Sequence, residues 1–542
     1  MYFLVGFLFL CNVSVLDFVF GAVINNNDLF RLDIVHYNDF HDRFEETSVP
    51  YPVCKTNDSN CLGGFPRLYH EVMVLMKEKP DALLLNAGDT FQGTYWYTLL
   101  KWNLTQHFIN MLPNDAHAIG NHEFDDGIAG LAPYLAALKA PVVAANIDSS
   151  KEPALHGLYK PHVILERRGR KIGIIGLITP ETMDSSNPQG VTFSDPIESV
   201  KKEAQILTEK GVDIIIVLSH CGLNVDIEMA KEVGENIDII VGGHSHSLLW
   251  NGTSPSHEKI SGPYPVTVAT KSHPQHKVLV VTASAMSKYL GNLTAYFDRD
   301  GELQSFDGSP VFLNRSIPED PHIKQLLEPY KQKLYTMVRE LVGYSGDDLR
   351  AEPCGSRECA VGDLATDAIL NATLERYETN LPSVAFLTRN MIRGSLPKGD
   401  VTRGSVINVL PFTNKVVTFV LQGRHLVEAF ENCFTNYWSF KPFNGPFLLQ
   451  IAGMKVTLNS TAGQVVSAAV RVGDGYEPLD PDQDYQVTSV RFLLKGGNGF
   501  SMLKNYSRDV RAVGVDADLV EEYIRKVTPL SDKLDNRLTI VN

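Results

Sequence analysis

The sequence predicts an α/β protein with more than one domain. Its 542 residues exceed the length of an ordinary single domain. In the first half, short apolar runs typical of buried strands alternate with amphipathic stretches typical of helices. Near-continuous apolar strands separated by helices belong to sheets that are covered on both faces.

The elements of the first half can be assigned in chain order. The predicted strands are RLDIVHY at 31–37, DALLLNAG at 81–88, KIGIIGLIT at 171–179, VDIIIVLSH at 212–220 and IDIIVGG at 237–243. The predicted helices between them are GFPRLYHEVMVLMKEK at 64–79 and PIESVKKEAQILTEKG at 196–211. Together they predict a first domain over 25–315.

A polar amphipathic stretch over 316–340 contains proline and aspartate at its start, which predicts a helical connector between domains. The region 341–542 reads as a separate α/β domain. Its predicted strands are KVVTFVLQG at 415–423 and YQVTSVRFLL at 485–494. Its predicted helices are VGDLATDAILNATLERY at 361–377 and GRHLVEAFENCF at 423–434.

Composition and missing motifs exclude several function classes. The net charge is −14 and no long basic run is present, which excludes nucleic acid as the expected partner. The sequence has no P-loop, no G-x-S-x-G elbow and no H-E-x-x-H helix. An acidic protein that binds anions must therefore supply positive charge locally, through arginine, lysine or metal.

The N-terminal stretch MYFLVGFLFLCNVSVLDFVFGAV predicts a signal peptide over 1–21, with cleavage after Gly21. The alternative is a retained anchor, because no Lys or Arg precedes the apolar run and Asp17 interrupts its end. No later run is long enough to span a membrane, and the C-terminal segment lacks a glycolipid-anchor signal. We therefore expect a secreted chain without a stable membrane anchor, and no segment indicates an obligate protein partner.

The N-glycosylation sequons and the spacing of the cysteines are those expected of an exported protein. Sites of the N-x-S/T type begin at Asn57, Asn103, Asn251, Asn292, Asn314, Asn371, Asn459 and Asn505. The close spacings of Cys54 with Cys61 and of Cys354 with Cys359 predict two local disulfides. The sequence leaves open whether Cys221 and Cys433 pair.

Aspartate, histidine and asparagine follow the ends of the first-half strands. The motifs are IVHYNDFH with Asp39 and His41, LLLNAGD with Asp89, AHAIGNHEFD with Asn121 and His122, IIIVLSH with His220, and IIVGGHSH with His244 and His246. Because sites in open α/β folds form beyond the carboxyl ends of strands, we expect these side chains at one rim. Oxygen and imidazole ligands without thiolate suit Zn²⁺, Mn²⁺ and similar ions. Two adjacent ions need a shared carboxylate, and Asp89 is the natural bridge.

In this order the motifs resemble the calcineurin-like metallophosphatases. The longer strings HYNDFHDRFEET, NAGDTFQG, GNHEFD, VLSHCG and VGGHSH resemble the 5′-nucleotidase family, as do CGSREC, VLPF and FLLKGGNGF in the second half. The resemblance implies a layered α/β/β/α metallophosphatase domain, a helical linker and a C-terminal α/β nucleotide-binding domain.

Residue by residue, the resemblance implies two metal sites and a catalytic dyad. One ion would bind Asp39, His41, Asp89 and His246, and the other Asp89, Asn121, His220 and His244. Zinc is favoured, with calcium, magnesium and manganese as alternatives. His122 would contact the phosphoryl group, with Asp125 orienting the imidazole, while a water activated by the two ions attacks the terminal phosphorus.

The resemblance also implies nucleotide contacts. Phe412 and Phe492 match a pair that sandwiches the base, and Arg393 matches a phosphate-binding arginine. The chain departs from the family pattern at three places. Thr388 and Arg389 replace residues of a glycine-rich stretch, Gly355 replaces an arginine whose role Arg357 would cover, and Asn498 replaces a ribose-binding aspartate.

The paired GHSHS motif, the segment FQGTYWYTLLKWN and the missing anchor signal resemble the apyrases in the saliva of blood-feeding arthropods, so the resemblance implies a secreted apyrase. Its substrates would be extracellular ATP and ADP, and its effect would be to prevent ADP-driven platelet aggregation. One alternative is a soluble 5′-nucleotidase that converts AMP to adenosine. An alternative of another class is a nucleotide scavenger without turnover.

Overall fold

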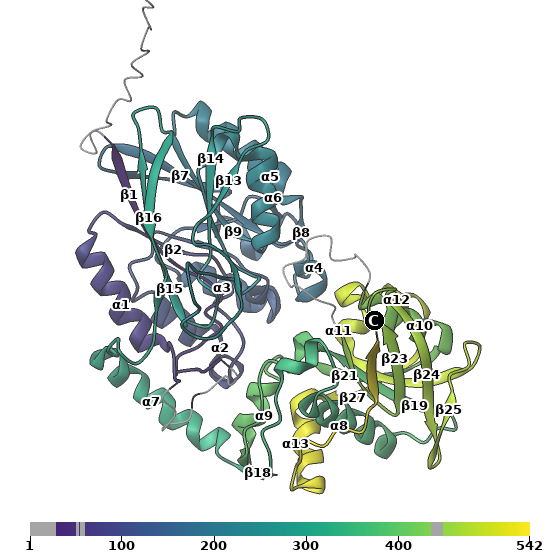
Figure 1. The fold of residues 1–542 in the computed structure, drawn as a ribbon. Helices are drawn as coiled ribbons and strands as arrows, with labels where there is room; N and C mark the ends of the chain where they lie inside the picture. Colours follow the sequence, from purple (N-terminus) through teal and green to yellow (C-terminus); the bar gives the residue numbers. More distant parts are fainter. Residues whose placement is uncertain (1–28, 50–53, 55–59, 435–447, 542) are drawn as a thin grey trace, which may run out of the picture.

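The structure, a computed structural model, describes residues 29–49, 54, 60–434 and 448–541 of the chain. The predicted signal peptide over 1–21 lies outside the described residues. Two α/β domains are joined by a long helix, with the N-terminal domain in purple to teal and the C-terminal domain in green to yellow (Figure 1).

The N-terminal domain contains two large mixed sheets. The first has the order β16-β15-β1-β2-β3-β4, with β17 paired to β15. The second has the order β13-β14-β10-β9-β7-β6. The strands of the first sheet are β1 (Phe30–Tyr37), β2 (Leu83–Asn86), β3 (Ala116–Ala118), β4 (Val142–Val143), β15 (Tyr289–Phe297), β16 (Leu303–Gly308) and β17 (Val311–Phe312). Those of the second are β6 (His162–Arg167), β7 (Arg170–Ile178), β9 (Ile214–His220), β10 (Ile239–Gly242), β13 (Val266–Ala269) and β14 (Lys277–Val281).

Side-chain alternation explains how the two sheets pack. Ile34 and Leu83 of the first sheet belong to the apolar cluster that contains the second sheet. Their neighbours Val35 and Leu84 belong instead to the cluster that contains Phe65 and other residues of the outer helices. Successive residues of a strand point to opposite faces, so each central strand contributes to two cores.

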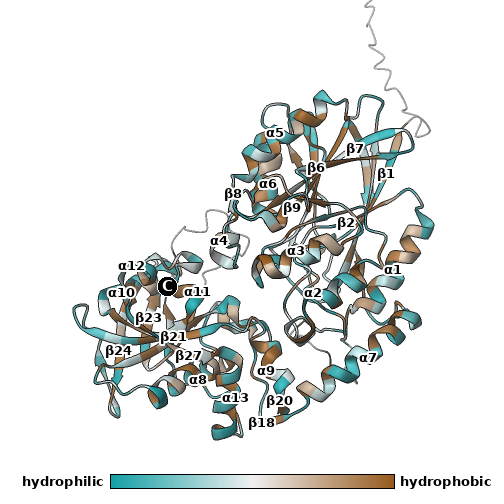
Figure 2. Ribbon diagram, turned by 180° about the vertical axis from the view of Figure 1, so that it is seen from behind, coloured by the Kyte–Doolittle hydropathy of each residue, from teal (hydrophilic) through white to brown (hydrophobic). Residues whose placement is uncertain are grey.

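Helices cover the outer faces and complete the α/β/β/α layers. They are α1 (Phe65–Glu78), α2 (Tyr95–Ile109) and α3 (Gly127–Ala137) by the first sheet, and α5 (Pro196–Glu209) and α6 (Leu223–Val233) on the second. Figure 2 shows apolar strands such as β7 and β9 inside the domain and helices with polar outer surfaces around them. The predicted layering of this domain is therefore observed.

Parallel pairing brings the predicted ligands to one rim. In the first sheet β1, β2, β3 and β4 run parallel, and in the second β7, β9, β10 and β14 do so. The carboxyl ends of parallel neighbours lie at the same edge, so the loops after β1, β2, β3, β9 and β10 meet there.

The helix α7 (Pro321–Val338) leads from the N-terminal to the C-terminal domain. Asp320 caps its N-terminus by accepting a hydrogen bond from the Ile323 N–H. The helix contacts α1 in one domain and α9 (Arg403–Val409) in the other. It therefore packs against both domains along its length, as Figure 1 shows.

The C-terminal domain contains a five-stranded and a four-stranded sheet. The first has the order β22-β19-β26-β21-β27 and the second β25-β24-β23-β28. The strands are β19 (Ser383–Thr388), β21 (Lys415–Gln422), β22 (Leu449–Ala452), β23 (Met454–Asn459), β24 (Gln464–Val472), β25 (Gly475–Pro478), β26 (Asp484–Val490), β27 (Arg508–Val515) and β28 (Leu538–Val541). The helices are α8 (Ala360–Arg376), α10 (Gly423–Asn432), α11 (Arg491–Leu494), α12 (Ser501–Tyr506) and α13 (Asp516–Val527).

Shorter elements complete the described chain. The strand pairs are β5 (Ile147–Asp148) with β8 (Thr192–Phe193), β11 (Leu248–Leu249) with β12 (Ile260–Gly262), and β18 (Leu341–Ser345) with β20 (Gly399–Thr402). The helical turns used below are α4 (Thr182–Ser185), η2 (His122–Phe124), η5 (Glu352–Gly355), η6 (Arg389–Met391) and η8 (Gly497–Gly499).

One sequence assignment was wrong. The stretch 485–494 was predicted as a single strand, but β26 ends at Val490 and residues 491–494 form α11. Pairing with β21 reaches its end where Val490 faces Val416, and the chain turns into a helix beyond that point. Phe492 therefore lies on a helical turn just beyond the C-terminal end of the central strand β26.

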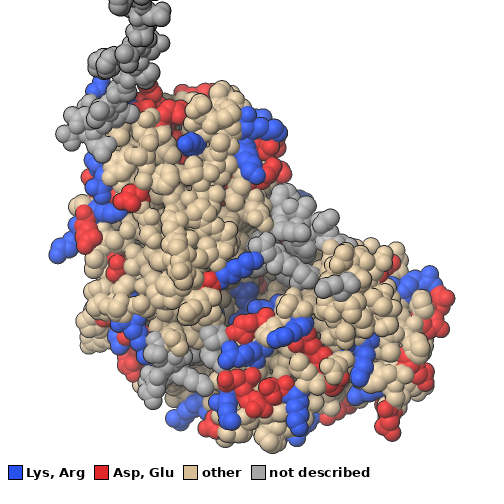
Figure 3. All heavy atoms as spheres, in the orientation of Figure 1, with Lys and Arg blue, Asp and Glu red and all other residues tan. Residues whose placement is uncertain are grey.

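The predicted local disulfides are both present, as Cys54–Cys61 and Cys354–Cys359. Cys221 and Cys433 are free and buried. Within the described ranges, no helix has the length and apolar character to cross a bilayer. Lys and Arg are interspersed with Asp and Glu over the face of the C-terminal domain drawn in Figure 3.

Candidate active site

The loops that carry the predicted ligands are held together through their backbones. The Asp39 N–H donates to Gly88 O at 2.9 Å, and the His41 N–H donates to Asp89 O at 3.1 Å. Several predicted ligands have left-handed backbones, namely Asp39 (φ 49°), His41 (φ 51°), Asp89 (φ 53°), His244 (φ 72°) and His246 (φ 51°). Such a conformation costs of order 1–3 kcal/mol for a non-glycine residue and concentrates at functional sites.

Asp39, His41 and His246 form one candidate metal group, with ligand atoms within 4.8 Å of one another. The His41 Nδ1 lies 3.1 Å from Phe91 O and 3.0 Å from Gln92 O. Because carbonyl oxygens only accept hydrogen bonds, Nδ1 carries the proton and Nε2 presents its lone pair. That lone pair faces the Nε2 of His246 at 3.0 Å. Burial holds the pKa of His41 well below its ordinary value, so the ring is a neutral donor.

Asp89, His220 and His244 form a second candidate group. The His220 Nδ1 donates to Ala87 O at 2.7 Å, which directs Nε2 to Asp89 Oδ2 at 3.1 Å. The same carboxylate oxygen lies 3.9 Å from the Nε2 of His41 in the first group. Asp89 therefore stands between the two groups, in the position that a bridging carboxylate requires.

Asn121 adds an amide oxygen at this rim. Its Oδ1 is buried and accepts no hydrogen bond from any residue that the structure describes. An unsatisfied buried oxygen is costly unless a cation or a donor fills the space beside it. Glycine at position 120 permits the close approach of this loop, because a Cβ there would lie 2.2 Å from Asp89 Oδ1.

This donor set fits two divalent cations. It offers carboxylate and amide oxygens and imidazole nitrogens with no thiolate, the ligand types of Zn²⁺, Mn²⁺ and related ions. Although burial opposes it, the imidazoles of His220 and His122 hold the pKa of Asp89 well below its usual range, so the carboxylate is ionised.

His122 and Asp125 lie together at the edge of the metal groups, and His122 also lies within metal-binding distance of His41 and Asp89. The His122 Nδ1 is 2.7 Å from Asp125 Oδ2, and its Nε2 is 4.0 Å from Asp89 Oδ2. Burial lowers the pKa of His122, but Asp125 and Asp89 outweigh that effect and raise it above its ordinary value. With Nδ1 bound to Asp125, Nε2 is the nitrogen that can contact a phosphoryl group.

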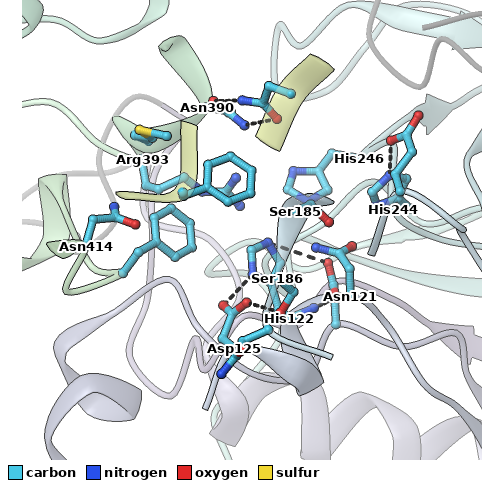
Figure 4. Close-up of a pocket in the computed structure, with 17 residues that line it drawn as sticks. Asn121, His122, Asp125, Ser185, Ser186, His244, His246, Asn390, Arg393 and Asn414 are labelled. Atoms are coloured by element: carbon cyan, nitrogen blue, oxygen red, sulfur yellow. Dashed lines mark hydrogen bonds and ion pairs between the residues drawn. The ribbon is translucent and has the colours of Figure 1, made fainter. Parts of the chain in front are cut away.

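Sequence reasoning missed a third member of this chain of hydrogen bonds. The Ser186 hydroxyl donates to Asp125 Oδ1 at 2.7 Å and leaves Oδ2 for the imidazole (Figure 4). Ser186 directly follows the short helix α4, 61 residues from Asp125 in the sequence. No spacing pattern pointed to it.

Glu123 also has a role that the sequence did not reveal. Its carboxylate accepts backbone hydrogen bonds from Asp89 (3.0 Å), Thr90 (2.6 Å), Phe91 (3.2 Å) and Gly120 (2.6 Å). Glu123 therefore ties the loop of Asp89 to the loop of Asn121. Its neighbour Asp126 accepts from Tyr97 at 2.9 Å and pairs with Lys101 at 3.1 Å, which is a structural contact away from the metal groups.

A cavity of about 240 Å³ lies between the domains (Figure 4). The N-terminal domain lines it with Asp89, Asn121, His122, Asp125, Glu181, Ser185, Ser186, Asn187, His244 and His246. The C-terminal domain lines it with Asn390, Met391, Arg393, Phe412, Asn414, Phe492 and Asn498. Sequence reasoning did not identify Asn187, Asn390 or Asn414. The cavity connects the metal groups to the predicted nucleotide contacts.

The predicted nucleotide contacts are partly brought together. Phe412 stacks on His122, and the Arg393 guanidinium lies 5.4 Å from the Phe412 ring centroid. Asn498 donates to Asn390 Oδ1 at 3.2 Å and to Thr388 Oγ1 at 3.3 Å. Arg357 is exposed and is not among the residues that line the cavity.

A separate acidic group in the C-terminal domain contains Glu358, Asp363 and Asp535. Arg537 lies 3.7 Å from Asp363 and 2.7 Å from Asp535. The guanidinium supplies the cation there, so the described geometry is that of an ion-pair network.

Comparison with known proteins agrees with this geometry. The chain is 41% identical over 525 residues to "Apyrase" of Tabanus yao, with 94% of each chain covered. It is 36% identical over 529 residues to "5'-nucleotidase" of Homo sapiens, with 94% of this chain and 91% of the relative covered. The chain belongs to the 5′-nucleotidase family.

The two domains match the two parts of that family. Residues 32–248 match the calcineurin-like phosphoesterase family, and residues 338–505 match the 5′-nucleotidase C-terminal domain. The crystal structure of a 5′-nucleotidase precursor from Thermus thermophilus superposes with a TM-score of 0.86 at 34% identity, covering 95% of this chain and 100% of that one. The predicted family and two-domain fold are thus confirmed, and this 5′-nucleotidase family member is a metal-dependent nucleotide phosphohydrolase.

Proposed function

We propose that this chain is a secreted apyrase that hydrolyses extracellular ATP and ADP to AMP and phosphate. Hydrolysis as far as AMP would remove the ADP that drives platelet aggregation during blood feeding. The observation that carries hydrolysis is the cavity that joins two groups of metal-binding side chains to Arg393 and two aromatic rings. The names of similar arthropod proteins, which include apyrases of Tabanus yao, Anopheles gambiae and Aedes aegypti, support the choice of ATP and ADP.

The metal-binding roles follow from the two groups. Asp39, His41 and His246 would hold one divalent cation, zinc being favoured, and Asn121, His220 and His244 would hold the other. Asp89 would contact both. When bound, two such ions polarise a phosphoryl group and lower the pKa of water, which supplies a nucleophile near neutral pH.

The chain's own groups would orient the substrate and stabilise its charge. The His122 imidazolium, oriented by Asp125 and Ser186, would donate a hydrogen bond to the phosphoryl oxygens as negative charge builds on them. Arg393 would add a second cation from the C-terminal side. The phosphate would thus be held by groups from both domains.

Phe412 and Phe492 would bind the base and Asn498 the ribose. Stacking on aromatic rings tolerates different bases, which suits an enzyme acting on several nucleotides. Asn390 and Asn498 form a neutral amide pair, and a carboxylate at this place would repel a polyphosphate.

Two features support secretion. The first is the apolar N-terminal stretch that reads as a signal peptide over 1–21. The second is the pair of local disulfides, which persist in oxidising compartments. We propose domain boundaries at 25–315, 316–340 and 341–542, because α7 connects the two α/β domains.

Phosphate release from ATP, ADP and AMP under matched conditions tests the proposal. The assay is repeated with a chelator and after re-addition of single divalent ions. We expect release from ATP and ADP, none after chelation, and recovery with metal. Turnover of AMP far above that of ADP would instead establish a 5′-nucleotidase, and stoichiometric ADP binding without phosphate release would establish a scavenger.

A further inference from the structure

Arg389 is a cation beside the site to which no role has been given. It begins the helical turn η6 directly after β19, four residues before Arg393. Its side chain runs over Gly355 of η5, because a Cβ on that glycine would lie 3.6 Å from Arg389 Cγ and 3.9 Å from Nε. A larger side chain at position 355 would compete with Arg389 for this space. Glycine at 355 therefore leaves room for the Arg389 stem.

Neither arginine of this loop forms an ion pair within 4 Å with a described carboxylate, although Asp89, Asp39 and Asp125 act on Arg393 from a longer distance. Arg389 makes one side-chain hydrogen bond, from Nη1 to the Ile392 carbonyl oxygen at 2.7 Å. Arg393 makes no ion pair among the described residues, and its guanidinium lies over the Phe412 ring. A guanidinium has five N–H donors, so most of the donors of both groups are left for a ligand.

The two guanidinium groups also repel each other. Burial lowers the pKa of Arg389 to about 10, and the positive charge of Arg393 adds to that effect. Glu352 is the carboxylate that acts against this shift, and it does not reach ion-pair distance. Placing two like charges together in a partly buried wall is unfavourable unless an anion binds between or beside them.

Arg389 and Arg393 lie on the side of the cavity away from the terminal phosphoryl group, which is the group that would be hydrolysed. A terminal phosphoryl group would lie at the rim of Asp89, Asn121 and His122, on the N-terminal side of the cavity. Arg393 lines the opposite, C-terminal wall, as do Asn390 and Met391. Arg389 directly precedes these residues; it lies next to that wall without lining it, within electrostatic reach of Arg393. A nucleoside monophosphate has one phosphate, which the N-terminal rim would hold. A di- or triphosphate has further anionic groups that extend toward the C-terminal wall.

We propose that Arg389, acting with Arg393, binds the non-terminal phosphate of a nucleoside di- or triphosphate and so sets the preference for these substrates over monophosphates. This inference rests on the proposed function. It identifies Arg389 as the residue that distinguishes the substrate classes, in place of the exposed Arg357.

The test compares Arg389→Met, Arg389→Lys and a matched control, Arg350→Met. Methionine keeps the apolar stem over Gly355 and removes the charge, while lysine keeps the charge without the fork of donors. Arg350 is an exposed arginine of the same domain, paired at 4.0 Å with Asp348. For the full chain with divalent ions, kcat/KM is measured for ATP, ADP and AMP.

We expect Arg389→Met to lower kcat/KM for ADP and ATP about tenfold or more, the loss typical of a hydrogen bond to a charged group. The value for AMP should stay within about twofold on the same basis. Arg389→Lys should keep part of the ADP activity, and Arg350→Met should match the wild type. An equal loss for AMP and ADP, or no loss for either, would overturn the proposal.

Equilibrium binding separates this inference from the proposed function. Calorimetry with α,β-methylene-ADP and with AMP should show weaker binding of the diphosphate alone in Arg389→Met, with an unchanged thermal unfolding midpoint as the check on folding. If the wild type releases no phosphate from ADP or ATP, the proposed function fails. The binding comparison still decides the role of Arg389 in that case, and unchanged diphosphate affinity would reject it.

Discussion

The ring of Phe412 lies parallel to the imidazole of His122, with centroids 5.4 Å apart and planes 11° apart. Phe412 belongs to the C-terminal domain and His122 to the N-terminal domain. The packing of the two domains therefore bears directly on the predicted catalytic ring. On its own side, Phe412 also lies near the Arg393 guanidinium, so one aromatic ring contacts both predicted phosphate-binding groups.

Replacing Phe412 tests this contact. Phe412→Ala should raise KM for ADP about tenfold, since stacking on one base is worth about 1–3 kcal/mol. It should also lower kcat, because the imidazole loses the ring that covers it. Phe412→Tyr keeps the stack and should retain most activity. Steady-state kinetics with ADP and with base-free tripolyphosphate separate the effects, and an unchanged kcat for both would show that the stack on His122 has no catalytic role.

Removal of the His122 imidazole should abolish most turnover without loss of metal. His122→Ala is expected to lower kcat by about 10²- to 10⁴-fold, the usual contribution of a positioned proton donor. Metal content, measured by elemental analysis of the purified variant, should equal that of the wild type. Loss of metal in this variant would make His122 a ligand, contrary to its predicted role.

Asp89 should be needed for metal and activity together. Because its carboxylate lies between the two candidate groups, Asp89→Ala removes a ligand from both. We expect loss of bound metal and of phosphate release in the same preparation. Asp81→Ala is the matched control, since Asp81 is exposed and pairs with Arg168 at 2.9 Å. A variant at Asp89 that keeps full metal content would contradict a bridging role.

Glu123 should be required for stability even though it does not face the cavity. Glu123→Ala leaves four buried N–H groups without their acceptor, each at a cost of roughly 1–3 kcal/mol. The thermal unfolding midpoint should fall by several degrees, and it should do so with chelator present, which separates this effect from metal loss. Glu78→Ala on the exposed side of α1 is the control. An unchanged midpoint would mean that the loops do not depend on this carboxylate.

Asp516 should make stability depend on pH. Burial raises its pKa to about 7 from 3.8, against hydrogen bonds from Asn414 and Ala517. Between these values the folded chain binds more protons than the unfolded chain, so raising the pH from about 4 to about 7 lowers stability. Asp516→Asn, which resembles the protonated acid, should reduce this decline in the unfolding midpoint. Asp474→Asn, at an exposed position of the same domain, should leave the decline as it is in the wild type, and equal slopes for all three proteins would refute the prediction.

Much of the fold could be predicted because its signals are local. The near-continuous apolar runs at 171–179 and 212–220 became the central strands β7 and β9. The prediction of one strand over 485–494 was wrong, because periodicity does not tell where strand pairing ends. Phe492 lies in the helix α11 for that reason. Hydrogen-bonded neighbours, not residue preference, determine such a boundary.

The residues of the candidate site also fall into those that the sequence could predict and those that it could not. Asp39, Asp89 and His220 could be identified from sequence, because each follows a strand and parallel strands share one rim. Ser186 and Arg389 could not be assigned, because their contacts join distant segments: Ser186 binds Asp125, and Arg389 lies over Gly355. Glu123 was passed over because its acceptor role depends on N–H groups more than 30 residues earlier in the chain.

The sequence alone determined the fold class, the family resemblance and the order of the metal-binding residue types, because these depend on local apolar runs and on residues at the ends of strands. Only the tertiary structure decided which nitrogen of His41 and of His220 faces the candidate metal groups, which carboxylate ties the loops together, and that Arg393 lines the cavity while Arg357 does not. Those properties arise from contacts between segments far apart in the chain, and such contacts exist only once the two sheets and the two domains have packed.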